Sequence, residues 1–209
     1  MTISSIFPDI QVDCLVAGKA PEDASAATSY LNRFTDRQLV RLNQQHTSNC
    51  LLYTKVEPNL DAELLTPADA ILSDRSDVVL SVRTADCLPI LVYHPSGIIG
   101  AIHAGRKGTD LGILQKALQS LKVHWGVENE VMLWFGPAIC TDCYQVARDT
   151  DLRYDLRAKN KLQVESVFDA NSIQIIDSEH CTYHDNQHWY SYRREGAGVP
   201  MNNSYISLQ

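Results

Sequence analysis

Short apolar runs, each bounded by polar or turn-forming residues, follow one another through most of the chain. Runs of roughly four to eight apolar residues between turn signals are typical of β-strands, above all when they are rich in valine, isoleucine and aromatic residues. This pattern predicts strands at residues 39–42, 50–53, 68–72, 78–82, 88–93, 98–103, 131–135 and 172–176. The middle of the chain is therefore expected to form β-sheet.

The clearest helix is expected at residues 111–125, where apolar side chains recur every three or four positions and so share one face. Gly108-Thr109-Asp110 supplies capping side chains before it, and Gly126 lies where a helix is expected to stop. Residues 152–164 combine charges with spaced leucines, which predicts a surface helix. Residues 58–66 predict a loop or a short helix.

Composition and charge narrow the class of protein. The chain has 209 residues, 44% of them apolar and 21% charged, which argues against disorder and favours one domain spanning residues 1–209. Its 25 acidic and 18 basic residues give a net charge of −7 without a long Lys/Arg run, so nucleic acid is not an expected partner. No apolar run approaches the ~20 residues of a membrane span, and the start lacks the basic segment of a signal peptide. We expect a cytoplasmic protein without a membrane partner, either a monomer or a weak homodimer.

The six cysteines are expected to be reduced thiols, most of them packing residues. Cys140 and Cys143 have the CxxC spacing of a redox or zinc pair, yet no second CxxC is found, so packing is the preferred interpretation. Histidines at positions 180, 184 and 188 have the spacing of a helical metal stripe, but the residues between them form a poor helix. The polar aromatic residues of this segment instead predict a surface that makes contacts.

Cys87 and His103 are the strongest candidates for chemistry. Cys87 precedes one predicted strand and His103 ends the next, so neighbouring strands can bring a thiol and an imidazole together, and His46 lies in a polar turn. Two imidazoles and a thiolate around zinc leave a fourth position open, as in catalytic zinc sites. A cysteine with a histidine base is also the equipment of a thiol nucleophile. The alternative, more frequent for such residues, is a buried small side chain and satisfied polar histidines.

The segment after His103 offers an anion site. Gly105-Arg106-Lys107-Gly108 precedes the predicted helix and combines backbone N–H groups, a helix N-terminus and two cations, which suit phosphate. Arg193 can supply a planar guanidinium to such an anion. Taken alone, these residues favour the simpler interpretation of a helix entry with two solvated bases.

Several motifs occur in a specific order: Gln44-Gln-His46, Arg83-Thr-Ala-Asp-Cys87-Leu-Pro-Ile, Ala101-Ile-His103-Ala-Gly105, Phe135-Gly-Pro-Ala-Ile139 with Cys143-Tyr144-Gln-Val146, Asp155-Leu-Arg157 and Ser191-Tyr-Arg-Arg194. Together they resemble the YfiH family, also called the multicopper polyphenol oxidase or laccase-domain family. The resemblance implies an α+β fold, a single domain of mixed β-sheets covered by helices in the order α/β/β/α. It also implies similarity to the catalytic domain of cytotoxic necrotizing factor toxins.

The same resemblance implies a function. The family's metal ligands fall on His46, Cys87 and His103, which are then both metal-binding and catalytic, with Zn2+ as the expected metal and copper as the other candidate. Family members cleave adenosine, inosine or methylthioadenosine with phosphate and deaminate adenosine, so a purine nucleoside and phosphate are the expected ligands. These ligands are expected to contact Gln44, Arg106, Lys107, Tyr144 and Arg193.

Three other functions stay open. The first is a Cys/His hydrolase or amidase on small peptides or cell-wall precursors, with Cys87 as nucleophile and His103 as base. The second, a copper-dependent polyphenol oxidase, is disfavoured as the main activity because a multicopper site needs more clustered histidines than the seven of this chain supply. The third is a catalytically impaired member that retains the scaffold and binds a ligand or partner.

Departures from the family pattern motivate the third alternative. Arg106 replaces the usual tryptophan and Lys107 the usual arginine, which removes an aromatic surface and a bidentate guanidinium. Thr47 stands where the family has glycine and where the backbone is expected to favour one. Gln145 replaces a glutamate. The expected metal ligands are retained, so the changes concern the residues around the substrate.

Overall fold

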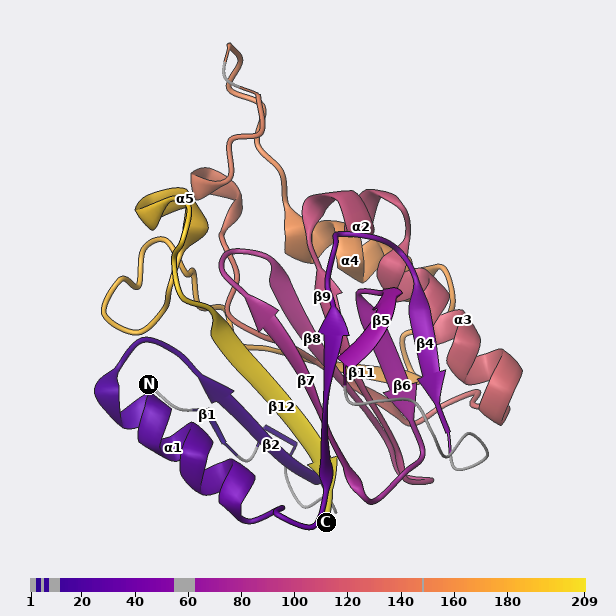
Figure 1. Cartoon of the computed structure of the whole chain (residues 1–209). Helices are drawn as coiled ribbons and strands as arrows, with labels where there is room; N and C mark the ends of the chain where they lie inside the picture. The colour runs from indigo at the N-terminus through magenta and orange to yellow at the C-terminus, as the bar shows by residue number, and fades with distance from the viewer. Residues whose placement is uncertain (1–2, 5, 8–11, 55–62, 148) are drawn as a thin grey trace.

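Two mixed β-sheets lie face to face in the computed structural model, which describes the chain except for residues 1–2, 5, 8–11, 55–62 and 148 (Figure 1). Within the described residues, the first sheet has the order β1 (Ile3–Ser4), β2 (Val12–Ala17), β12 (Asn202–Leu208), β7 (Val78–Thr84), β3 (Gln38–Asn43) and β5 (Glu63–Pro67). The second has the order β11 (Ile173–Asp177), β10 (Val131–Phe135), β8 (Leu88–His94), β9 (Ile98–Ala104), β6 (Ala70–Ser73) and β4 (Cys50–Tyr53). Each sheet contains both parallel and antiparallel pairs.

Helices cover the outer faces of both sheets (Figure 1). The helix α1 (Pro21–Asn32) packs on the first sheet, while α3 (Ile113–Trp125) and α4 (Leu156–Glu165) pack on the second. The described residues also form the short helical elements α2 (Arg106–Asp110), the 3-10 helix η1 (Thr141–Cys143) and α5 (Tyr192–Glu195). This layering confirms the predicted α+β fold of mixed sheets covered by helices.

Burial on both faces explains why the strands of the second sheet are continuous apolar runs. In β8, Leu91 and Tyr93 pack into the core between the sheets, whereas Ile90 and Val92 pack into the core under α3 and α4. Successive side chains of a strand point to opposite faces, and both faces are covered here. Each large side chain buried in this way contributes about 1.5–3 kcal/mol to stability.

The hairpin of β8 and β9 determines where the candidate chemistry lies. Leu88 pairs with Ala104, so Cys87, just before β8, and Gly105, just after β9, lie at the same end of the sheet. The strand β6 runs antiparallel to β9, and β4 runs parallel to β6. Residues 44–49 therefore enter β4 at this same end.

The predicted strands are confirmed with small shifts of their ends, and the main errors lie elsewhere. Within the predicted loop or short helix at 58–66, residues 63–67 form β5 instead, because they pair in parallel with β3. The part of that prediction at 58–62 lies outside the described residues. The predicted elements did not include α1, β2 or β12. The segments of α1 and β12 contain few large apolar residues, whereas β2 is mostly apolar and was missed.

The predicted helix at 111–125 is confirmed for most of its length, but its start is wrong. It begins at Ile113, because Gly112 adopts the left-handed conformation (φ 77°), and Leu111 is 56% exposed rather than on the core face. The preceding residues form α2, so the helix N-terminus expected near residue 108 lies at Arg106. None of the helices in the described part of the chain has the length and apolar character needed to cross a membrane.

Candidate functional site

Three side chains converge where β8 begins and β9 ends: His46, Cys87 and His103. One donor atom of each lies within 4.8 Å of the other two, and Cys87 Sγ is 3.6 Å from His46 Nε2. The ring centroids of His46 and His103 are 4.8 Å apart. Ligands at about 2.0–2.3 Å from zinc stand roughly 3–4 Å from one another in a tetrahedron. The three side chains are therefore grouped closely enough to share one metal ion.

Asp69, a fully buried carboxylate, organises this group. Its Oδ1 lies 2.7 Å from Nδ1 of His103 and accepts the backbone N–H of His46 at 3.1 Å. Its Oδ2 accepts the backbone N–H and the hydroxyl of Thr47 at 2.6 and 2.8 Å. When the Nδ1 proton of His103 is donated to a carboxylate, Nε2 is free to bind a metal, which is the usual arrangement around metal-bound histidines.

The loop that carries His46 differs from its sequence prediction. The left-handed backbone conformation falls on His46 itself (φ 59°) and not on Thr47. Thr47 binds Asp69 with both its N–H and its hydroxyl, and a glycine would supply no hydroxyl. The expectation that position 47 favours glycine is therefore wrong for this chain, and the threonine supports the ligand group.

The pKa values of Cys87 and His103 favour a charged pair in the protein without metal. Burial acts to raise the pKa of Cys87, but the neighbouring His103 and His46 outweigh it and lower this pKa to about 6. Burial acts to lower the pKa of His103, whereas Cys87 and Asp69 raise it to about 9. At neutral pH the sulfur therefore carries the negative charge that a metal ligand or a nucleophile needs.

Gly105→Ala is expected to weaken metal binding. A Cβ at this position would lie 2.6 Å from His46 Cδ2 and 3.0 Å from Cys87 Sγ, so both candidate ligands would have to move. Misplaced supporting groups cost about 10–100-fold in metal affinity, and competition with a fluorescent zinc chelator measures the loss. The control is Gly126→Ala, where the added Cβ meets no atom within 4 Å but the left-handed backbone (φ 67°) disfavours alanine. It therefore reproduces a loss of stability without any contact with His46 or Cys87. Equal affinity in both variants would contradict the ligand grouping.

A cavity of ≈ 750 Å³ opens over His46, Cys87 and His103, all of which line it. Small-molecule sites typically have volumes of about 300–1,000 Å³. The remaining wall comes from the loop before β4, the turn between β7 and β8, the residue after η1, and α5 with the loop that follows it. The cavity is thus built from segments that lie far apart in the sequence.

Three of the five residues predicted to bind substrate or phosphate line the cavity: Gln44, Tyr144 and Arg193. The Gln44 amide bonds the backbone of Arg83 twice, with Nε2 donating to the carbonyl at 2.7 Å and Oε1 accepting the N–H at 2.9 Å. The Arg193 guanidinium lies 5.6 Å from the ring centroid of Tyr144 and donates to the Gln145 carbonyl at 2.8 Å. These contacts help to position Arg83, Arg193 and the ring of Tyr144 in the wall of the cavity that His46, Cys87 and His103 also line.

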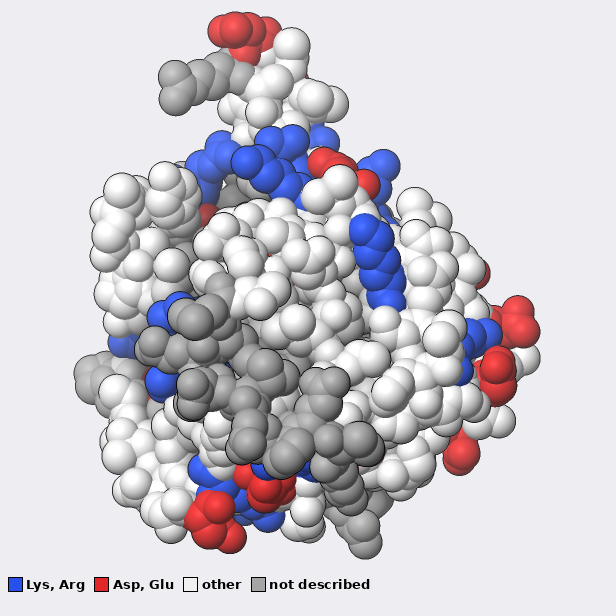
Figure 2. All heavy atoms as spheres, turned by 45° about the vertical axis from the view of Figure 1, so that its right-hand side comes forward, with Lys and Arg blue, Asp and Glu red and all other residues white. Residues whose placement is uncertain are grey.

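The other two, Arg106 and Lys107, lie outside the cavity wall as far as the structure describes it. Arg106 lies 4.0 Å from Asp110 and hydrogen-bonds the side chain of Tyr144, and Lys107 is exposed. Figure 2 shows Lys and Arg side chains gathered in a band below the projecting arm that connects η1 to α4. Arg106 can therefore act on a ligand through Tyr144 or at the rim.

Sequence reasoning missed three residues of the site: Asp69, Arg83 and Asp86. Asp86 is buried in a left-handed conformation (φ 90°), and its carboxylate accepts the Thr182 hydroxyl and the Arg193 N–H, both at 2.6 Å. Asp86 had a signal, since it belongs to the motif that ends in the candidate metal ligand. Arg83 had the same signal, because it begins that motif, whereas Asp69 had none, because a single charged residue beside a strand is usually solvated.

Comparison with known proteins shows the family. A family model described as "Multi-copper polyphenol oxidoreductase laccase" matches residues 20–167, and the chain belongs to this family, as its resemblance to the YfiH proteins implies. A Campylobacter jejuni protein named purine nucleoside phosphorylase is 29% identical over 171 residues, 75% of this chain and 71% of that protein. A Corynebacterium glutamicum protein with the same enzyme name is 28% identical over 202 residues, 84% of this chain and 79% of that protein.

Other similar proteins extend the comparison. A protein from an unknown prokaryotic organism, named adenosine deaminase RL5, is 29% identical over 155 residues, 63% of this chain and 59% of that protein. The structure of YlmD from Geobacillus stearothermophilus has a TM-score of 0.80 at 21% identity, over 98% of this chain and 94% of that chain. Neighbours at this identity show the shared fold.

Proposed function

We propose that this chain is a zinc-dependent purine nucleoside phosphorylase that cleaves adenosine, inosine or methylthioadenosine with phosphate and also deaminates adenosine. The observation that carries the proposal is the grouping of His46, Cys87 and His103 at a cavity large enough for a nucleoside. The names of the relatives, purine nucleoside phosphorylase and adenosine deaminase, support the same two reactions.

The donor set fits zinc. Two imidazoles and one thiolate match the three protein ligands of a catalytic zinc site, the pKa of the Cys87 thiol is lowered, and Asp69 supports the His103 tautomer that leaves Nε2 free. Copper is the alternative metal, because the same nitrogen and sulfur donors bind it. When bound, the metal supplies a Lewis acid with an open coordination position.

The remaining side chains suit phosphorolysis. In that reaction a phosphate oxygen bonds to C1′ of the ribose, the bond from C1′ to the purine nitrogen breaks, and the departing purine takes up a proton. We assign phosphate to the guanidinium groups of Arg83 and Arg193, whose planar forks match its oxygens. Burial and the Cys87 thiolate raise the pKa of Tyr144, although Arg106 and Arg193 oppose them. Tyr144 therefore keeps its proton at neutral pH and can donate a hydrogen bond to the purine.

Arg193→Gln is expected to raise the KM for phosphate. A charge-assisted hydrogen bond contributes about 1.5–3 kcal/mol, so the KM should rise roughly 10–100-fold while the KM for inosine changes little. The measurement is hypoxanthine release at varied phosphate concentration. Arg33→Gln is the matched control, because Arg33 forms a surface ion pair with Asp13 on the first sheet, a pair worth about 1 kcal/mol or less.

The outcomes separate the alternatives. Hypoxanthine release that is independent of phosphate would exclude phosphorolysis. If the metal-loaded protein releases no purine from any of the three nucleosides and does not deaminate adenosine, the impaired binding protein is the better description.

A Cys/His hydrolase is the second candidate, and the charged pair of Cys87 and His103 favours it. A nucleophilic cysteine stays active when metal is removed and is inactivated by a thiol alkylator, whereas a metal ligand is protected from alkylation by its metal. Peptide or amide hydrolysis that persists in a chelator would therefore support this second function.

A further inference from the structure

A second group of metal-type donors lies outside the cavity, where the loop after β10 meets the segment that leads to α5. The Sγ atoms of Cys140, Cys143 and Cys181 and an imidazole nitrogen of His184 lie within 4.8 Å of one another. His184 Nε2 is 3.2 Å from Cys143 Sγ, and His184 Nδ1 is 3.8 Å from Cys140 Sγ. All four residues are half-buried or exposed, so an ion can reach them from solvent.

The spacing of these residues supports their grouping. Cys140 and Cys143 form a CxxC pair, and Cys181 and His184 form a CxxH pair much later in the chain. Two such pairs from distant segments that meet in space are typical of closed, four-ligand structural zinc sites. A redox CxxC needs only the first pair, so the convergence of all four donors favours a metal.

We infer that Cys140, Cys143, Cys181 and His184 bind a structural zinc ion, distinct from any ion at the cavity. Three thiolates and one imidazole form a soft donor set that suits zinc and disfavours magnesium and calcium. The four donors complete a tetrahedron and leave no open position for water or substrate. The ion at this site therefore stabilises structure and takes no part in bond making.

Backbone contacts already join the two ligand pairs. Ala138 and Cys181 form a parallel β-bridge. The backbone N–H of Cys140 donates to the Cys181 sulfur at 3.3 Å. N–H donors directed at a sulfur stabilise its thiolate form. Cys181 is thus held as a ligand by the fold itself.

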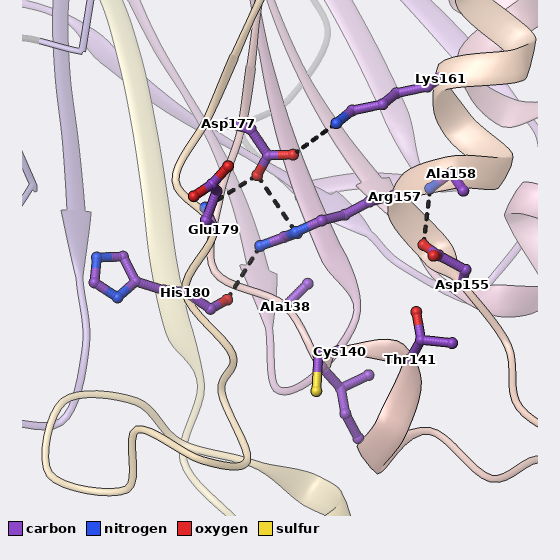
Figure 3. A pocket seen from close by; sticks show the side chains of 11 residues that line it. Ala138, Cys140, Thr141, Asp155, Arg157, Ala158, Lys161, Asp177, Glu179 and His180 are labelled. Carbon is purple, nitrogen blue, oxygen red and sulfur yellow. Dashed lines mark hydrogen bonds and ion pairs between the residues drawn. The ribbon is translucent and has the colours of Figure 1, made fainter.

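Arg157 hydrogen-bonds the backbone of both segments. Its guanidinium donates to the carbonyls of Gly136 and His180 at 3.0 and 3.1 Å and forms an ion pair with Asp177 at 3.3 Å. Figure 3 shows Arg157 reaching toward the His180 carbonyl across a cavity of ≈ 390 Å³ whose wall also includes Cys140. Because the segments are fixed before metal binds, closing the site costs little conformational entropy.

The proposed site would also secure the wall of the cavity described above. Tyr144 directly follows Cys143, and Thr182 lies inside the CxxH pair. The Thr182 hydroxyl donates to Asp86 at 2.6 Å, and Asp86 in turn accepts the backbone N–H of Arg193. An ion at the second site would therefore hold Tyr144 and Arg193 in position.

Zinc content of purified variants tests the inference. Wild type is expected to hold about two zinc ions per chain, and Cys87→Ser and Cys143→Ser about one each. The double variant is expected to hold none. Cys50→Ser is the matched control, since Cys50 is a half-buried thiol in β4 that belongs to neither group, and it should keep both ions. The comparison separates the two sites, because the zinc at the four-donor site can still be measured when the zinc at the cavity is lost.

X-ray absorption of the zinc retained by Cys87→Ser provides a test that does not depend on the folding of Cys143→Ser. The expected coordination is three sulfurs at about 2.3 Å and one nitrogen at about 2.0–2.1 Å. Zinc with fewer than three sulfurs would overturn the inference. So would a Cys87→Ser protein that holds no zinc, or Cys140 and Cys143 recovered as a disulfide from protein prepared without oxygen.

Discussion

Cys87→Ser is expected to abolish phosphorolysis while the fold is retained. A serine hydroxyl is a poor zinc ligand at neutral pH, whereas the Cys87 thiol, with a pKa of about 6, would bind the proposed ion as the thiolate. Without the proposed ion the cavity would lack its Lewis acid, and kcat/KM for inosine should fall roughly 10³-fold or more, about 4 kcal/mol of transition-state stabilisation. The measurement is hypoxanthine release at saturating phosphate.

The control for this prediction is again Cys50→Ser, which removes a thiol that does not line the cavity and should keep the wild-type rate. Circular dichroism checks that both variants are folded. Wild-type activity in Cys87→Ser, with no metal bound at the cavity, would show that neither the thiol nor the ion takes part in the reaction.

Asp69→Asn is expected to weaken both metal binding and the fold. The carboxylate accepts N–H groups from the His46 loop, the Thr47 hydroxyl and the His103 ring, and an amide NH2 would face donors in place of an acceptor. We expect metal affinity to fall about 10–100-fold and the free energy of unfolding to fall by roughly 2–4 kcal/mol. Chelator competition and urea unfolding measure the two effects.

The pH dependence of the stability effect follows from the pKa of Asp69. Burial acts to raise this pKa, but hydrogen bonds from His103 and Thr47 outweigh it and lower the pKa from 3.8 to about 2. A carboxylate whose pKa is lower in the folded than in the unfolded protein stabilises the fold at pH values above its unfolded-state pKa. This contribution is lost as the pH falls through the folded-state pKa. The difference in unfolding free energy between wild type and Asp69→Asn should therefore be largest above about pH 4 and shrink toward pH 2. A difference that grows on acidification would contradict this role of Asp69.

The strands around the site could be predicted because both of their faces are buried. The runs that form β8 and β9 contain few polar residues, and the turn after His94 indicates a hairpin. Once the hairpin is assumed, Cys87 and His103 must lie near each other. His46 needed the family resemblance, since nothing local indicates that its loop enters β4 beside the start of β6.

Asp69 could not be predicted, and the grouping of His184 with the three cysteines was missed, because both roles depend on pairing between distant segments. Asp69 becomes a buried acceptor only when β6 lies between β4 and β9. His184 becomes a candidate ligand only when the segment after β11 meets the loop after β10, although the CxxH spacing of Cys181 and His184 was available as a signal. A search for a CxxH pair after the CxxC pair, and not only for a second CxxC, would have grouped His184 with the three cysteines.

The most direct test of the proposed function is the reaction of one protein preparation with inosine, first stripped of metal and then reloaded with zinc, each with and without phosphate. The account predicts equal amounts of hypoxanthine and ribose 1-phosphate in the zinc-loaded sample with phosphate, and neither product when metal or phosphate is omitted. Reloading with copper in a parallel sample tests the alternative metal. Equal product formation by the stripped and the zinc-loaded protein would contradict a metal-dependent reaction at His46, Cys87 and His103.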